Sequence, residues 1–243
     1  LLLLRRTNDR AAGSSGFGGI GALRAVGGWM PLVQTYALFG FSYILMTSFL
    51  VARLHDDAGF TVGQVSAVVT INGVASIISG VLLGRLADRF GERQVLIWSF
   101  AISAVATLIC LTSNFPIVVG AAFMLSVWTT GVPAVVASYV IRRTSVSTYG
   151  PAFSAMTFAF GITQAVSPQV GGLIADAFGS FTLVFLLSAL TRAAGFVTAT
   201  RLPRAVLPPE RASGPLPHTD VAASGAAGVS EPPRIRFNED AAD

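Results

Sequence analysis

The chain has 243 residues, of which 53% are apolar and only 12% are charged, and its formal net charge is +4. Water-soluble domains carry about 25% charged residues, so this composition excludes an ordinary soluble domain and places the chain in a lipid bilayer. The arginines stand at the ends of apolar runs rather than in one patch, which argues against a nucleic-acid partner. With His55, His218 and Cys110 as the only histidines and cysteine, no metal site or other cofactor is expected.

Residues 1–29 are rich in Gly, Ser, Ala and Arg, which predicts a flexible linker. A bilayer core of about 30 Å is crossed by a helix of roughly 17–25 apolar residues. Six later segments are long enough, and they lack the alternation that a membrane strand needs. The predicted helical spans are 31–52, 61–83, 95–111, 116–141, 151–175 and 181–200. Residues 202–243 are dominated by Pro, Ala, Ser, Gly and charges, which predicts a disordered tail.

Arginines near the predicted membrane ends are distributed unevenly between the two sides. One side holds Arg24, Arg85, Arg89, Arg93, Arg142, Arg143, Arg201 and Arg204. The other side holds only Arg53. Because cytoplasmic loops carry the excess of basic residues, both termini and the turn around Asp88 are predicted to lie in the cytoplasm.

The loop between the second and third spans reads Gly84-x3-Asp88-Arg89-x-Gly91-x-Arg93. Glycines permit close helix approach and a tight turn, and a carboxylate at a helix end accepts bonds from a neighbouring helix N-terminus or an arginine. This loop resembles the signature loop of the major facilitator superfamily of transporters. The resemblance implies that these residues latch the cytoplasmic side shut in the outward-facing state, with Arg89 and Arg93 as the cations. The alternative is an ordinary positively charged turn.

The same skeleton returns later in the chain as Gly172-x3-Asp176-x2-Gly179, without the cations. By the predicted topology this copy lies on the opposite side of the membrane, where few arginines are expected. Pro168 and the pair Gly171-Gly172 also match the eleventh helix of the superfamily. The two copies each follow the second helix of a triple, as an inverted repeat of three plus three helices predicts.

Six spans with the signature loop after the second imply an all-α, polytopic protein that forms the C-terminal half of a twelve-helix bundle. The expected domains are a cytoplasmic linker at 1–29, the six-helix transmembrane half at 30–201 and a cytoplasmic tail at 202–243. Because the chain begins with four leucines and no Met, we expect a truncated reading frame whose upstream part encodes the other half.

Two short segments of the first span, 36–43 and 48–52, resemble the start of the second half in the YbfB/YjiJ-like bacterial group of this superfamily. That resemblance implies a bacterial protein of the inner, or plasma, membrane. The lipid bilayer and the missing N-terminal half are then its expected partners.

In the superfamily fold the first helix of each triple lines the central cavity. The candidate cavity residues are Tyr36, Tyr43, Thr47, Trp128, Thr129, Pro133 and Gln164. Packing of the aromatic residues against a neighbouring helix and hydrogen bonding of the polar ones between helices are open alternatives. Pro133 removes a backbone bond and predicts a kink or hinge. Arg192 is the only charged residue well inside a span, and a structural role is favoured for it over a functional one.

The predicted function is secondary active transport of a small solute by alternating access, with a coupling ion such as H⁺. No carboxylate lies within a span, so a proton-binding acid would have to come from the other half. An enzyme is not expected, because the spans hold no paired acids, histidine cluster or nucleophile with a base. The alternative is a membrane scaffold or sensor without transport activity.

Overall fold

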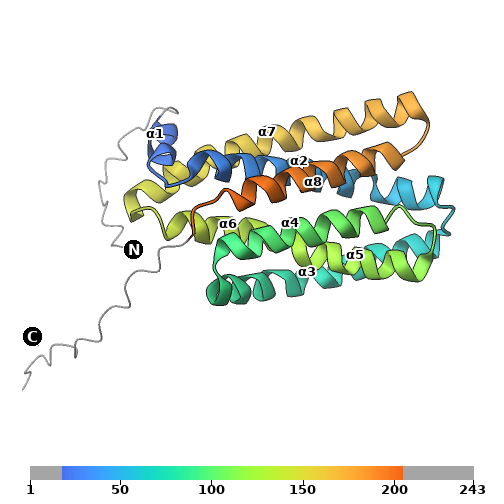
Figure 1. The fold of residues 1–243 in the computed structure, drawn as a ribbon. Helices are drawn as coiled ribbons and strands as arrows, with labels where there is room; N and C mark the ends of the chain where they lie inside the picture. The colour runs from blue at the N-terminus through green and yellow to red at the C-terminus, as the bar shows by residue number, and fades with distance from the viewer. Residues whose placement is uncertain (1–17, 205–243) are drawn as a thin grey trace, which may run out of the picture. The chain divides into compact units, whose positions relative to one another are not determined.

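The computed structural model describes residues 18–204, which fold into helices joined by short turns (Figure 1). No strand occurs within this described part of the chain. Its helices are α1 (Gly18–Arg24), α2 (Trp29–Ala52), the π-helical turn η1 (Arg53–Asp57), α3 (Val62–Phe90), α4 (Glu92–Ile109), α5 (Phe115–Thr129), α6 (Val132–Ile141), α7 (Val146–Phe178) and α8 (Thr182–Thr200). The all-helical fold class is therefore confirmed.

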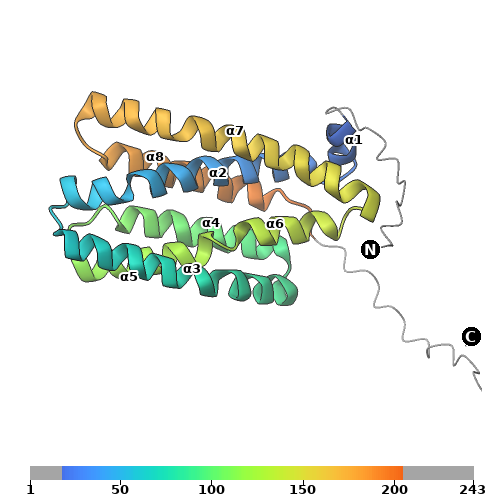
Figure 2. The same ribbon diagram turned by 180° about the vertical axis from the view of Figure 1, so that it is seen from behind.

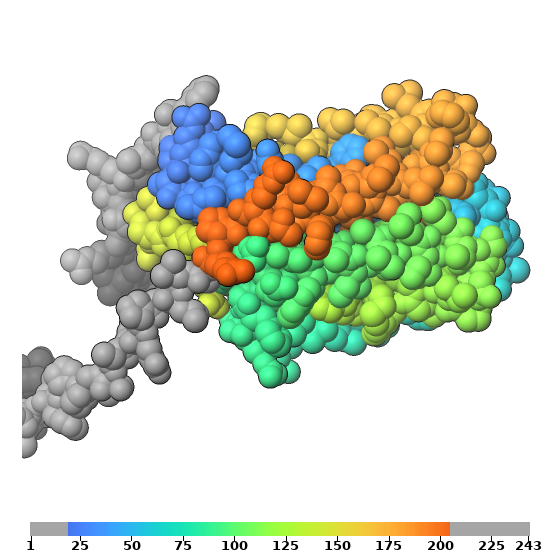
Figure 3. All heavy atoms as spheres, viewed as in Figure 1, coloured from blue at the N-terminus to red at the C-terminus, as the bar shows by residue number. Residues whose placement is uncertain are grey.

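The long helices run side by side (Figure 1, Figure 2), and in chain order they form two related triples, α2–α3–α4 and α5/α6–α7–α8. Helix α2 packs against α7 and α8, whereas α5 packs against α3 and α4. Helices α4 and α8, the last of each triple, pack against each other, and the space-filling view shows them in direct contact (Figure 3). Exchanging the two triples leaves this list of contacts unchanged, as the predicted internal repeat requires.

Within residues 18–204, five of the six predicted spans form helices that are long and apolar enough to cross a membrane. They are Trp29–Asp57, Val62–Phe90, Glu92–Ile109, Phe115–Ile141 and Thr182–Thr200. Helix α7 has ample length, with 33 residues, but polar residues such as Gln164 and Gln169 reduce its apolar character. A long helix of this kind is suited to contact protein or a water-filled cavity along part of its length.

The charged loop after the second span is mostly helical rather than a turn. Helix α3 continues through Phe90, and the chain turns only at Gly91, whose φ is +86°. Gly91 therefore needs the freedom of a residue without a side chain. A methyl group added at Gly84 would meet nothing within 4 Å, so the expected close helix approach is absent there. The run Arg85-Leu86-Ala87 favours continuation, since these residue types are good helix formers.

Both ends of the helical bundle extend beyond the predicted boundaries. Residues 18–24 form α1 instead of flexible linker, and Leu23 and Val26 are buried in the same apolar core as the long helices. At the other end Leu202 is also buried. Burial of these apolar side chains explains the added order. The predicted linker at residues 1–17 and the predicted tail from residue 205 onward lie outside the described residues.

Candidate functional site

The signature loop takes part in an ion-pair cluster, which we call the Arg142 cluster, made of Asp88, Glu92, Ser138 and Arg142. Arg142 directly follows α6, and its Nη2 lies 2.7 Å from Asp88 Oδ1 while its Nε lies 2.8 Å from Glu92 Oε1. The Ser138 hydroxyl lies 3.4 Å from the same Glu92 oxygen. The Glu92 side chain is only 1% exposed, whereas that of Asp88 is 72% exposed. Glu92 is therefore the buried anion of the cluster.

The other two arginines of the signature motif lie apart from Asp88. The Arg93 Nη2 donates to the carbonyl of Thr200 at 2.6 Å, which ties the start of α4 to the end of α8. The Arg89 guanidinium lies 5.2 Å from the centre of the Phe90 ring. The cation that pairs with Asp88 is thus Arg142, rather than the expected Arg89 or Arg93. The sequence did offer a hint of this pairing, because Arg142 ends a predicted span on the same side of the membrane as Asp88.

The predicted fourth span is broken into α5 and α6, close to Pro133. Proline at the second position of α6 has no N–H to donate to a preceding turn. The Ser79 hydroxyl of α3 occupies the break: it donates to the carbonyl of Val127 at 2.7 Å and accepts from the N–H of Gly131 at 2.7 Å. These two backbone groups would bond to each other in a continuous α-helix. A side chain inserted into the helical ladder is a recognised cause of a bend.

Gly131 is required at this break by close packing as well as by hydrogen bonding. A methyl group at Gly131 would lie 2.9 Å from the carbonyl oxygen of Ser79 and 2.9 Å from Leu83 Cδ1. The break is therefore a defined contact between α3 and the α5/α6 helix. Sequence reasoning located it at Pro133 but missed Ser79, whose role depends on a contact between distant segments.

Two of the candidate cavity residues are buried in helix packing. Tyr36 is 3% exposed, and its ring stacks on Phe160 of α7 with centroids 4.3 Å apart. Thr129 is 2% exposed and its hydroxyl donates to the carbonyl of Leu125 at 2.6 Å. For both residues the structure provides the packing or bonding partner that the alternative interpretation requires.

The remaining candidates are half-buried, and none of them lines the two surface hollows described next. These candidates are Tyr43, Thr47, Trp128, Pro133 and Gln164. The Thr47 hydroxyl donates to the carbonyl of Tyr43 at 2.9 Å within its own helix. Their assignment to a substrate cavity stays a prediction.

Hollows in the surface lie at other positions. One hollow of about 690 Å³ lies between the end of α2 and the start of α3. Its lining includes Ser48, His55, Asp56, Ser66 and Thr70. Another of about 630 Å³ lies along α7 and includes Ser154, Thr157 and Gly161. Both volumes fall in the range of small-molecule sites.

An all-helical bundle with several helices long and apolar enough to cross a membrane defines a polytopic membrane protein. The chain belongs to the Major Facilitator Superfamily, whose family model matches residues 16–234. The assignment to the YbfB/YjiJ-like group stays a prediction.

Individual relatives are transport proteins by name, and each matches this chain over only part of its own length. Protein ZINC INDUCED FACILITATOR 1 of Arabidopsis thaliana is 29% identical over 164 residues, which is 65% of this chain and 32% of that protein. The sialic acid transporter NanX of Escherichia coli is 21% identical over 145 residues, 59% of this chain and 36% of the relative. The fold resembles the E. coli fucose:proton symporter FucP, with a TM-score of 0.65, 21% identity and coverage of 79% of this chain and 46% of the symporter. The chain thus spans less than half the length of these relatives.

Proposed function

We propose that this chain forms the C-terminal half of a secondary active transporter that moves a small solute by alternating access. The observation that carries this proposal is the family match over residues 16–234, together with coverage of 46% of the fucose:proton symporter. The exposed sides of α3 and α7 add support, since only 22% of the apolar window in α3 is buried within this chain. A second bundle packed on these helices would complete the carrier.

The coupling ion of the proposed carrier is H⁺, by analogy with the fucose:proton symporter. Among the described residues the acids lie at or near helix ends, as do Asp57, Asp88 and Glu92. A proton site at mid-membrane would therefore be supplied by the other half.

Expression of residues 1–243 alone is expected to give a membrane-inserted protein that moves no solute, because its exposed faces lack an opposing wall. Co-expression with the upstream half should produce proton-coupled flux. The measurement is quenching of a pH-sensitive dye in membrane vesicles, with a panel of sugars, organic acids and drugs added in turn. Membrane levels of the chain serve as the control. Robust flux from the isolated chain would contradict the half-carrier proposal and favour a homodimer of six-helix units. A chain that never supports flux with its upstream half would instead favour a scaffold or sensor.

We further propose that the protein lies in a bacterial inner membrane with the Arg142 cluster in the cytoplasm. Cysteine introduced at Asp56 should then react with an impermeant maleimide in intact cells, whereas cysteine at Val146 should react only after permeabilisation. Both positions are exposed in the structure. The natural Cys110 is fully buried, so it should stay unlabelled and need not be replaced. Labelling of the Val146 position from outside would reverse the proposed orientation.

A further inference from the structure

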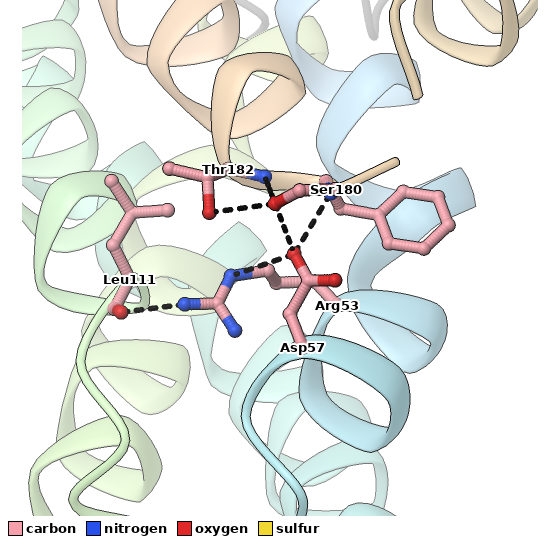
Figure 4. Close-up of polar contacts among 6 residues, drawn as sticks. Arg53, Asp57, Leu111, Ser180 and Thr182 are labelled. Atoms are coloured by element: carbon pink, nitrogen blue, oxygen red, sulfur yellow. Dashed lines mark hydrogen bonds and ion pairs between the residues drawn. The ribbon is translucent and has the colours of Figure 1, made fainter. Parts of the chain in front are cut away.

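A second polar cluster lies at the end of the bundle opposite the Arg142 cluster (Figure 1), and Figure 4 shows it in close-up. It consists of Arg53, Asp57, the carbonyl of Leu111, Ser180 and the N–H of Phe181, and we call it the Asp57 cluster. Asp57 Oδ2 accepts from the Ser180 hydroxyl at 2.9 Å and from the Phe181 N–H at 2.8 Å. The same oxygen lies 3.8 Å from Arg53 Nε. One carboxylate therefore joins the end of α2 to the turn between α7 and α8.

Arg53 extends this connection to a third segment. Its Nη2 donates to the carbonyl of Leu111, just beyond the end of α4, at 2.6 Å. The side chain of Arg53 is 6% exposed and that of Asp57 is 15% exposed. Both residues lie on η1, a π-helical turn, and such turns are rare and are often found at functional sites. Charged hydrogen bonds in a largely buried setting are stronger than those at an open surface.

The internal repeat relates the two clusters. The spacing that connects Gly84 to Gly172 and Asp88 to Asp176 also connects Glu92 to Ser180. Glu92 receives a cation that follows α6, and Ser180 donates to an acid that follows α2. In each case the end of the first helix of one triple is bonded to the turn between the second and third helices of the other.

The end of the last helix is held in a similar way in both triples. Arg93 donates to the carbonyl of Thr200 at the end of α8, and Arg53 donates to that of Leu111 beyond α4. Asp176, the sequence counterpart of Asp88, is exposed and has no hydrogen-bond or ion-pair partner among the described residues. On this face the polar connection is made by Asp57 instead.

We propose that Arg53 and Asp57 are positioning residues of a second latch, which holds the end of α2 against the α7–α8 turn and the end of α4 on the face opposite the Arg142 cluster. The inference rests on the proposed transport function. Alternating access requires each face to close in turn, and the two clusters place comparable polar connections at opposite ends of this six-helix half. The acid and its cation come from one turn, so this latch adds no net charge to a face that carries few arginines.

The first arm of the test measures the latch in the chain itself, in lipid nanodiscs, by hydrogen exchange. The Asp57→Ala variant should speed exchange of the Phe181 amide by about tenfold or more, because a charge-assisted hydrogen bond is lost. The matched control is Asp56→Ala, an exposed neighbouring acid, which should change this rate less than about twofold. Ser180→Ala removes the bonds of the Ser180 hydroxyl to Asp57 and Thr182 but leaves the Phe181 N–H bond to Asp57 in place, so it supplies a milder variant should Asp57→Ala fold poorly. An unchanged exchange rate of the Phe181 amide in both Asp57→Ala and Ser180→Ala would overturn the latch.

The second arm tests gating in the carrier assembled with its upstream half. Ser66 on α3 and Ser154 on α7 are exposed, are related by the internal repeat and lie near opposite faces. Cysteine at Ser66 should be labelled several-fold faster in the Asp57→Ala background, and cysteine at Ser154 more slowly. General loosening of the fold would raise both rates.

Each outcome of the second arm separates the inference from the proposed function. Transport with non-reciprocal labelling would overturn the gating role and leave the proposed function standing. A wild-type carrier that assembles and transports nothing would overturn the proposed function and the gating role together, whereas the exchange result would still decide whether Asp57 holds the turn.

Discussion

Glu92→Gln is expected to loosen the Arg142 cluster far more than Asp88→Asn, although Asp88 is the acid of the signature motif. Glu92 is 1% exposed and lies 2.8 Å from Arg142 Nε, so its replacement removes a charged hydrogen bond with a net contribution of about 1.5–3 kcal/mol. Asp88 is 72% exposed, and ion pairs in that setting contribute about 0–1 kcal/mol. Asp88→Asn should therefore have a small effect on stability.

The measurement is the thermal unfolding midpoint of the purified chain in detergent, followed by labelling of cysteine at Ser154 in the assembled carrier. Glu92→Gln should lower the midpoint and speed labelling at Ser154, whereas Asp88→Asn should leave the midpoint nearly unchanged. Arg142→Gln breaks both ion pairs and should match or exceed Glu92→Gln. Equal effects of the two acid variants would mean that the exposed Asp88 contributes as much as the buried Glu92, contrary to the geometry.

The spans and their grouping into two triples were largely predictable, because hydropathy, turn residues and the repeated motif can be read along the chain. Apolar runs located every long helix, and the repeat of the Gly-x3-Asp skeleton predicted two related triples. The break near Pro133 also followed from local chemistry, since proline removes a backbone donor. Local signals failed where a segment is both polar and helical: α3 continues through the charged residues up to Phe90, although the same residues suggested a turn.

The polar clusters were less predictable, because burial of a side chain depends on contacts between distant segments. Glu92 and Asp88 are both acids in one short motif, and their spacing does not reveal that only Glu92 is covered. Arg53 and Asp57 resembled an ordinary polar end of a span, because their partners at Leu111 and Ser180 lie far along the chain. The repeat did contain a usable signal, since it places Ser180 at the position equivalent to Glu92.

Arg192→Met is expected to raise the thermal stability of the purified chain. Arg192 is 0% exposed in the middle of α8, and none of its three guanidinium nitrogens has a hydrogen-bond partner within residues 18–204. A buried cation without compensation is costly, and replacing buried ionic groups by apolar ones of similar size is often neutral or stabilising by about 1–4 kcal/mol. Methionine is long and flexible enough to fill the space between α8 and its neighbours.

The unfolding midpoint of Arg192→Met in detergent, compared with wild type and Arg192→Lys, measures this effect. Lysine keeps the buried charge and should give no gain, which separates removal of charge from a change of shape. A higher midpoint for the Met variant alone would identify the guanidinium as a source of instability within this half. If the Met variant is instead clearly less stable, the guanidinium contributes to the stability of this half, as the structural role favoured from the sequence requires. A gain in stability for Arg192→Met would instead replace the structural role favoured from the sequence with a functional one, since a charge kept inside a membrane span at a net cost in stability marks a site of binding or coupling.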